Sequence, residues 1–377
     1  MKKSLLALAV LAVATSATAA TVYDKDGTSL KVGGRVQAVA FNGNFDKAGE
    51  DDSTLKNSAR FNVAGTTKVN DAVSVFAFTE WEASNGNKEK GADNDFTARD
   101  QYVGADFGVF GKVQAGKSLN AIYDVQSATD VFEEVGSAQV QGDTNGDRRS
   151  GTFRYIYDNN GLYASASFQT AQDQVKVAGD KLDVENGFGF GLGYTFDNVV
   201  FGPLSVKAAY DYVKCQDDSD FTQKLNGNDS NGRVFDSFKN TAVSVAWGSD
   251  TGLYFAALYN VYKTTFDNYT DGDGIYRTNP RAKVKGAELV AGYGFDNGLS
   301  VTIGYDVKDS KKKATGWTSE SKIQRRVPVI ANYQVAPTFK VWVEAEFDAN
   351  SSDNANNDKK THNNKDTLFA AGARYVF

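Results

Sequence analysis

The chain has little of several residue types on which enzymes and disulfide-rich secreted domains depend. Its 377 residues include one cysteine, Cys215, one histidine, His362, and only 4 prolines. One cysteine permits no internal disulfide, and one histidine leaves neither a histidine-based catalytic triad nor a multi-histidine metal site. We therefore predict that the chain is not an enzyme and that it holds no metal ion or cofactor.

Long apolar runs are also missing after the N-terminal segment. Residues 1–19 combine Lys2 and Lys3 with an apolar run and small residues that end at Ala19, which is the layout of a signal peptide cleaved before residue 20. No later segment approaches the eighteen or so uninterrupted apolar residues of a membrane helix, so a helical membrane protein is excluded. We predict an exported chain in which residues 20–377 form one domain.

Positive charge is in the minority. Residues 1–19 contain two lysines and no acid, so the remaining chain has 39 basic against 47 acidic side chains and a net charge of −8. Nucleic acid requires a basic surface, and we therefore predict no nucleic-acid partner.

What the sequence does have is alternation. From Gly187 to Phe196 every second residue is large and apolar, and most of the residues between are glycine. The same period recurs in 299–308 and 339–348, where charged residues occupy the other face. Because successive side chains of a strand point to opposite faces, each segment has one apolar face. A soluble sandwich could bury that face in a core, whereas a membrane-spanning β-barrel would turn it to lipid.

The number and spacing of these segments favour the barrel. Short turns such as 296–298 alternate with long polar loops such as 215–237, 265–283 and 350–365, an asymmetry typical of outer-membrane barrels and without purpose in a sandwich. We count sixteen segments: 29–41, 58–69, 72–83, 96–107, 112–118, 149–158, 162–172, 187–198, 204–214, 238–249, 253–264, 284–295, 299–310, 324–335, 338–349 and 366–377. We predict an all-β, sixteen-stranded antiparallel transmembrane β-barrel, a size that leaves an aqueous channel.

Several short motifs resemble a known family. They are Ala20 with the opening Val22-Tyr23-Asp24-Lys25-Asp26-Gly27, then Gly33-Gly34-Arg35, Ala59-Arg60-Phe61, Ala98-Arg99, Gly116-Lys117 and the terminal Tyr375-Val376-Phe377. Together they resemble the general diffusion porins of Gram-negative bacteria, a sixteen-stranded trimeric family, over all of residues 20–377. The resemblance implies a homotrimer in the cell outer membrane, in contact with outer-membrane lipid and lipopolysaccharide, that passes small hydrophilic solutes and ions.

Residues 119–148 interrupt the alternation, and the resemblance makes them the third loop, which folds inward in this family and constricts the pore. Residues 129–136 resemble its acidic turn, with Asp130 and Glu134 in the carboxylate positions and Glu133 where the family often has proline. On the opposite wall Arg35, Arg60 and Arg99 match basic positions of the family. Arg148 or Arg149 matches the next one, and alternation favours Arg148.

Facing rows of acids and arginines would create a field across the pore that sorts ions and aligns dipolar solutes. The alternative is that these side chains form ion pairs that hold the loop to the wall. The net charge of −8 and the many acids of the loops favour a weak preference for cations.

A subunit contact is predicted for Lys117 and Asp100. Alternation from Arg99 turns Asp100 outward, where lipid would make its charge costly, and the family position that matches Lys117 receives a loop from the neighbouring subunit. The outward residues of the first three strands are mostly small. This fits a wall that faces another subunit, or simply a wall with fewer aromatic residues.

Other functions compete with passive diffusion. A substrate-specific channel would need a track of aromatic side chains in the lumen, and Trp342 is the only inward tryptophan that alternation identifies. An adhesin or structural barrel, acting mainly through its long external loops, is the alternative from a different class.

Overall fold

A computed structural model describes residues 19–42, 54–85, 96–134, 148–177, 180–216, 235–270, 276–313, 321–349 and 367–377. Residues 1–18, most of the predicted long loops and residues 135–147 of the predicted constriction loop lie outside these ranges. No helix in the described part of the chain is long and apolar enough to cross a membrane.

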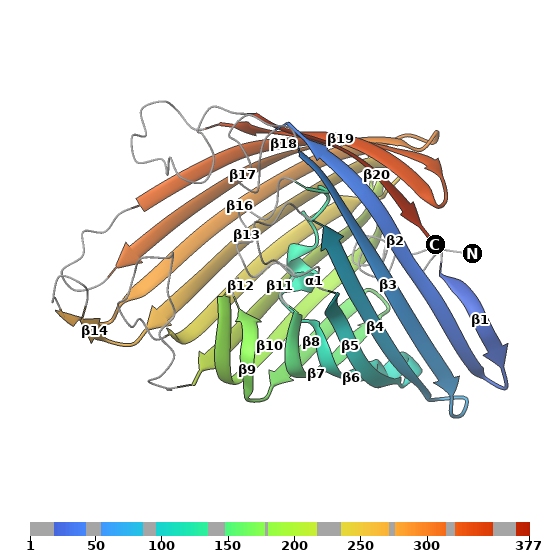
Figure 1. Ribbon diagram of the computed structural model, residues 1–377, viewed down its shortest axis with the longest axis horizontal. Coiled ribbons are helices and arrows are strands. Elements are labelled where there is room, and N and C mark those ends of the chain that lie inside the picture. The colour runs from blue at the N-terminus through green and yellow to red at the C-terminus, as the bar shows by residue number, and fades with distance from the viewer. Residues whose placement is uncertain are drawn as a thin grey trace.

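Sixteen strands form a closed antiparallel barrel (Figure 1). Each strand pairs with its neighbour in chain order, and β2 closes the ring by pairing with β20. The strands of the ring are β2 (Thr28–Phe41), β3 (Thr54–Lys68), β4 (Ser74–Asn85), β5 (Thr97–Asp106), β6 (Lys112–Leu119), β7 (Arg148–Asn159), β8 (Leu162–Gln169), β10 (Asp180–Val199), β11 (Gly202–Cys215), β12 (Phe235–Gly248), β13 (Gly252–Phe266), β16 (Arg281–Gly294), β17 (Leu299–Lys313), β18 (Ser321–Ala336), β19 (Phe339–Asp348) and β20 (Leu368–Val376).

The predicted fold is confirmed, since each of the sixteen predicted segments overlaps one strand of the ring. The sequence did not predict the short elements: β1 (Ala20–Lys25), β9 (Gln172–Val177), the hairpin of β14 (Tyr269–Thr270) and β15 (Tyr276–Arg277), a 3-10 turn (Gly108–Phe110) and one helical turn, α1 (Tyr123–Gln126). These elements add to the barrel without changing the order of its sixteen strands.

The two ends of the described chain meet where the ring closes. β1 pairs with residues 28–32 of β2, and β20 pairs with residues 35–41 along the same edge. Gly34 and Phe377 exchange two backbone hydrogen bonds, of 2.9 and 3.0 Å. A Cβ on Gly34 would lie 2.6 Å from the ring of Phe377, so the close approach requires glycine.

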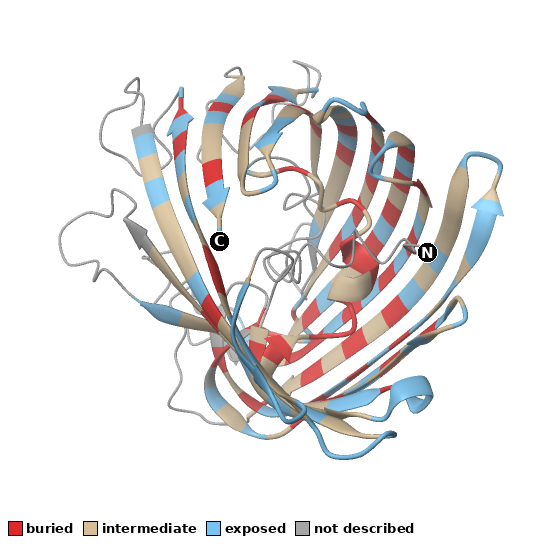
Figure 2. Cartoon of the chain, turned by 90° about the vertical axis from the view of Figure 1, so that its right-hand side faces the viewer, coloured by how far each residue is buried: buried red, intermediate tan, exposed pale blue. Residues whose placement is uncertain are grey.

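The wall has an apolar outside and a polar inside. In β10, Phe188, Phe190, Leu192 and Tyr194 are exposed on the outer face, and Figure 2 shows buried and exposed bands alternating along the strands. The buried polar side chains include the charged Glu80, Asp211, Glu288 and Arg326. This inverts the order of a soluble protein, and it is the arrangement that lipid requires.

Candidate functional site

The segment that follows β6 runs along the buried faces of distant strands. Ile122, the residue before α1, and Val125 of α1 pack against Ala209 of β11, Ala242 of β12 and Leu258 of β13. Further along, Gln126 donates a hydrogen bond to Asn260 Oδ1 at 3.4 Å, and the Tyr254 hydroxyl donates to the Ala128 carbonyl at 2.5 Å. Thr129 bonds to Glu288 of β16. Residues 120–129 are therefore held against β11, β12, β13 and β16 in turn.

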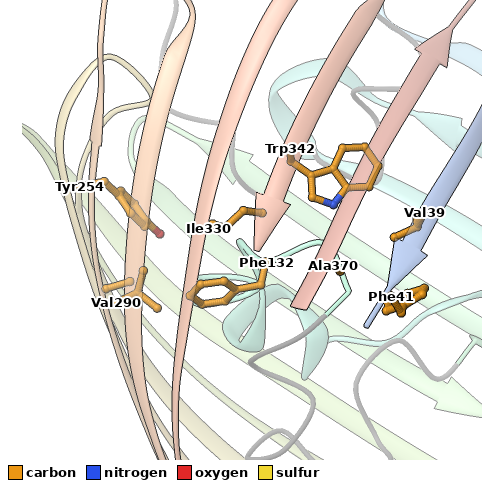
Figure 3. Packing of buried hydrophobic residues seen from close by; sticks show 9 residues of the cluster. Val39, Phe41, Phe132, Tyr254, Val290, Ile330, Trp342 and Ala370 are labelled. Atoms are coloured by element: carbon orange, nitrogen blue, oxygen red, sulfur yellow. The ribbon is translucent and has the colours of Figure 1, made fainter. Parts of the chain in front are cut away.

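Phe132 is the apolar anchor of this segment. Figure 3 shows its ring among side chains from several strands. The cluster contains Val39, Phe41, Phe132, Tyr254, Ala256, Val290, Ile330, Trp342 and Ala370. A Cβ on Gly304 would lie 3.0 Å from the Phe132 ring, so glycine in β17 makes room for it. Trp342 is inward as predicted, but it is buried in this cluster and forms no part of an aromatic track.

Glu133 is an electrostatic anchor beside Phe132. Its carboxylate accepts hydrogen bonds from Lys340 of β19 and from Arg374 of β20, and its backbone N–H donates to Glu344 Oε2 at 3.2 Å. Burial alone would raise the pKa of Glu133, but the two cations outweigh it and lower the pKa to about 2. For this residue the alternative interpretation holds: the acid pairs with the wall. Neither Lys340 nor Arg374 was predicted as a partner of Glu133.

Asp130 and Glu134 have different surroundings. Asp130 accepts a hydrogen bond from the Tyr123 hydroxyl at 2.9 Å, and burial together with this carboxylate raises the pKa of the Tyr123 phenol. Glu134 is exposed and accepts a hydrogen bond from Gln37 Nε2 at 3.2 Å. Gln37 lies two residues from Arg35 on β2, so the acidic end of the segment approaches the first of the predicted arginines.

The predicted arginines lie on one stretch of the ring, on β2, β3, β5 and β7, with carboxylates between them. Arg35 and Arg60 are directly opposite each other on β2 and β3. Arg60 donates to Glu82 Oε1 at 2.9 Å, and Arg99 donates to Glu80 at 2.9 Å and to Glu82 at 2.5 Å. Alternation along β4 turns both glutamates inward, and sequence reasoning missed them although that signal was present. Among the described residues, Arg35 has no ion-pair partner.

A β-bulge changes the prediction for Asp100. Glu80 pairs with Asp100 and Trp81 pairs with Ala98, so Arg99 is the extra residue. Because a bulge suspends strict alternation, Arg99 and Asp100 both point inward. Asp100 is buried and accepts a hydrogen bond from Arg148 Nε at 2.8 Å. The predicted outward orientation of Asp100 is wrong, and the subunit contact predicted from it loses its basis.

Lys117 lies near the same bulge. Its Nζ donates to the Ala98 carbonyl at 2.6 Å, and its Cα partner across the ladder is Gln101. Its role in a subunit contact stays a prediction.

The two arginines at the start of β7 have separate partners. Arg148 joins the row through Asp100. Alternation from Arg154 would turn Arg149 outward, yet Arg149 is inward as well, so alternation does not decide between the two. Arg149 is buried and bonds to both oxygens of Asp211 at 2.6 and 2.7 Å. Arg154, also inward, binds Asp124 of α1 and the Leu119 carbonyl. Arg148 therefore extends the arginine row. Arg149 links β7 to β11, and Arg154 links β7 to the start of the segment.

A closed sixteen-stranded barrel with an apolar exterior and a charged interior defines a class of membrane channel. Comparison with known proteins identifies the family within that class. The model of the Gram-negative porin family matches residues 25–377. The chain therefore belongs to the Gram-negative porin family.

Known relatives are similar in sequence to this chain over its full length. The chain is 29% identical over 385 residues to the outer membrane porin PhoE of Escherichia coli K12, and 30% identical over 387 residues to the outer membrane porin protein OmpD of Citrobacter koseri, with both proteins covered completely in each case.

Solved structures share the fold. Salmonella typhi OmpF, solved in complex with daunomycin, has a TM-score of 0.72 at 22% identity and covers 95% of this chain and 100% of its own. The trimer form of Vibrio cholerae OmpT has a TM-score of 0.64 at 16% identity and covers 93% and 100%.

These findings confirm the resemblance inferred from the sequence. The chain is an outer-membrane porin, a passive diffusion channel. The adhesin or structural-barrel alternative finds no support among the matches.

Proposed function

We propose that residues 119–148 fold into the lumen and form, with the arginine row on β2, β3, β5 and β7, the constriction that filters small hydrophilic solutes and ions. The observation that carries this proposal is the double anchor at Phe132 and Glu133, which ties the segment to β17, β18, β19 and β20, far around the ring from β6. A segment attached to opposite sides of the ring must cross the channel or follow its inner wall.

The filter acts through charges of opposite sign in a narrow aqueous gap. Arginine keeps its charge at any physiological pH, so the row is a fixed array. Arg35, which lacks an ion-pair partner among the described residues, and Glu134, which is exposed, are the two groups best placed to act on a passing solute. Polar solutes can align with the field between such groups, whereas apolar solutes gain nothing from it.

A weak preference for cations is consistent with this arrangement. Glu80, Glu82 and Asp100 lie among the four arginines and offset most of the row's positive charge. The chain without residues 1–19 carries a net charge of −8, which raises the local concentration of cations at the channel mouths.

The assembly and export of the chain are further parts of the proposal. We infer a homotrimer, in keeping with the trimer form solved for V. cholerae OmpT and with the small outward side chains Val36, Ala38 and Ala40 on β2. Residues 1–19 act as a cleaved signal peptide, and lipid and lipopolysaccharide surround the barrel. The chain has no catalytic activity and needs no cofactor.

Conductance of the purified chain in planar bilayers tests the channel and its filter. The chain should conduct in steps grouped in threes, and a variant with Asp130→Ala and Glu134→Ala should have a reversal potential shifted toward anions. A matched variant with Asp71→Ala and Asp197→Ala, two exposed acids at the short turns, should behave like the original. No conductance would refute the channel, and an unchanged reversal potential in the first variant would refute the filter.

A further inference from the structure

The alternating glycines between Gly187 and Phe196 are a motif that the proposed filter does not use. They lie on the inner face of β10, where Gly191 belongs to a row of small residues on four neighbouring strands. Gly191 is directly opposite Ser165 of β8 and Ala209 of β11, and Ala209 is opposite Ala242 of β12. Neighbouring strands lie about 4.8 Å apart, so the row is about 14 Å long. We call these four residues the small-residue row.

Larger side chains flank the small-residue row on both sides. In the next row toward the short turns, Tyr163 and Lys207 are both opposite Gly193, and Lys207 Nζ lies 4.7 Å from the centre of the Tyr163 ring. In the next row toward the predicted long loops, Asp211 is opposite Asn240. The small-residue row is therefore a recess in the inner wall.

The start of the segment fills this recess. Ile122 and Val125 are fully buried against the two alanines of the row, and in Figure 1 α1 lies beside β11. A Cβ on Gly191 would lie 3.6 Å from the Ala121 carbonyl oxygen, which is van der Waals contact. Small residues let two backbones approach closely, and here no more than a methyl group fits between β10 and the segment.

Tyr163 limits the space on the other side of Gly191. A Cβ on Gly191 would lie 3.3 Å from the Tyr163 ring, closer than an ordinary contact. The Tyr163 hydroxyl bonds to Asp124 of α1, which also binds Arg154. A side chain larger than a methyl group at position 191 would therefore meet both the segment and a residue bonded to the segment, and it would displace α1 away from the wall.

Gly189 makes room for a second group on the same face. It is opposite Asp211 of β11 and Ser167 of β8. Arg149 of β7 bonds to both oxygens of Asp211 at 2.6 and 2.7 Å, although β8 and β10 lie between their strands. A Cβ on Gly189 would lie 3.2 Å from Asp211 Oδ1 and 2.9 Å from Ser167 Oγ. The glycines of β10 thus keep both the ion pair and the segment close to the wall.

The recess faces the arginine row across the ring. Counted from β2, β11 is the ninth of the sixteen strands, so β11 and β2 lie on opposite sides. A displacement of α1 away from β11 is therefore a displacement toward Arg35 on β2, and it narrows the gap between them.

We propose that the small-residue row sets the size limit of the channel, because it recesses the start of the segment into the wall and leaves the rest of the lumen to larger hydrophilic solutes. Gly191 is the positioning residue of the row, and it acts through the segment. This inference rests on the proposed inward fold of residues 119–148.

Entry of a neutral monosaccharide, disaccharide and trisaccharide into proteoliposomes tests the proposal, since neutral solutes report the size limit without the charge filter. In Gly191→Leu the largest sugar that enters through the original chain should be excluded, while the monosaccharide should still enter. Gly191→Ala adds one methyl group, which fits, and should keep the original limit. The matched control Thr195→Leu enlarges a side chain on the same face of β10, about 13 Å along the strand, where Thr195 bonds to Ser205; it should also keep the original limit.

Ala209→Val provides a second test if Gly191→Leu does not fold. It adds two methyl groups to the same row from β11, valine suits a strand, and its size limit should fall as well. Electrophoresis of unheated samples shows which variants are folded. An unchanged or larger limit in the folded variants, a full loss already in Gly191→Ala, or an equal loss in Thr195→Leu would each overturn the proposal.

The variant with Asp130→Ala and Glu134→Ala separates this inference from the proposed filter. If its reversal potential shifts as expected while Gly191→Leu and Ala209→Val keep the original size limit, the filter stands and the role of the small-residue row is refuted. If its reversal potential does not shift, the filter itself fails.

Discussion

Removal of the Phe132 ring tests whether the apolar anchor holds the segment to the wall. Phe132 is 9% exposed and packs in a cluster with Val290, Ile330 and Trp342. Replacing a buried phenylalanine by alanine costs about 3–5 kcal/mol, and we take the low end, about 3 kcal/mol, because water from the lumen can enter the space. The hydrogen-bonded ring of strands does not depend on this side chain, so the loss falls on docking of the segment. About 3 kcal/mol is a factor of roughly 150 in the population that is undocked.

Thiol labelling measures that population. Ser127 belongs to the segment and is buried while the segment is docked, so a Ser127→Cys side chain reacts with a membrane-impermeant maleimide only when the segment opens. The buried Cys215 is replaced by serine throughout. Adding Phe132→Ala should accelerate labelling by up to about two orders of magnitude, while Phe132→Leu, which keeps most of the apolar volume, should have a much smaller effect. Equal labelling rates in all three proteins would refute the anchor.

Three other predictions concern charged groups. The pKa of Glu133 in the folded chain lies near 2, below its ordinary 4.5, so its ion pairs contribute fully above pH 4.5 and are lost as the pH falls toward 2. Open-channel current noise should therefore rise between pH 4.5 and 2. Glu133→Gln should show the higher noise already at pH 7. Asp100→Asn removes the carboxylate to which Arg148 Nε donates and should shift the reversal potential toward anions without changing trimer melting, and a loss of the trimer instead would restore Asp100 to the subunit contact. Lys117→Ala should lower the melting temperature of the trimer in detergent, and an unchanged value would count against its predicted contact.

The fold was predictable because the membrane imposes one rule on every strand. Lipid outside and water inside make the period of two visible in each of the sixteen segments, with no knowledge of the packing required. The short β1 and β9 follow no such rule. All six residues of β1 are exposed. In β9 the period of two is reversed, because the apolar Val175 and Val177 are buried with Val184 and Val213.

The site was predictable only in part, because local departures from strict alternation decide which of its side chains point inward. The inward glutamates Glu80 and Glu82 obey the alternation of β4 and could have been found from it. The bulge at Arg99 could not, since the pairing of β4 with β5 decides which residue is extra. The apolar anchor left a weak signal: Val39 and Phe41 put apolar side chains on the inner face of β2 while Ala38 and Ala40 occupy the outer face.

The ion pairs of Glu133 and the exposed charges of the proposed constriction should respond differently to salt. The ion pairs of Glu133 are buried, with side chains 11 to 18% exposed, and buried pairs are screened far less than exposed charges. Phe132 is an apolar contact, which salt does not weaken. Between 0.1 and 1 M salt the Debye length falls from about 10 to about 3 Å, so the field that sorts ions is lost first. Cation preference should therefore vanish over this range while open-channel noise and the labelling of Ser127→Cys stay constant. A parallel rise in labelling would mean that docking of the segment depends on the same charges that select ions.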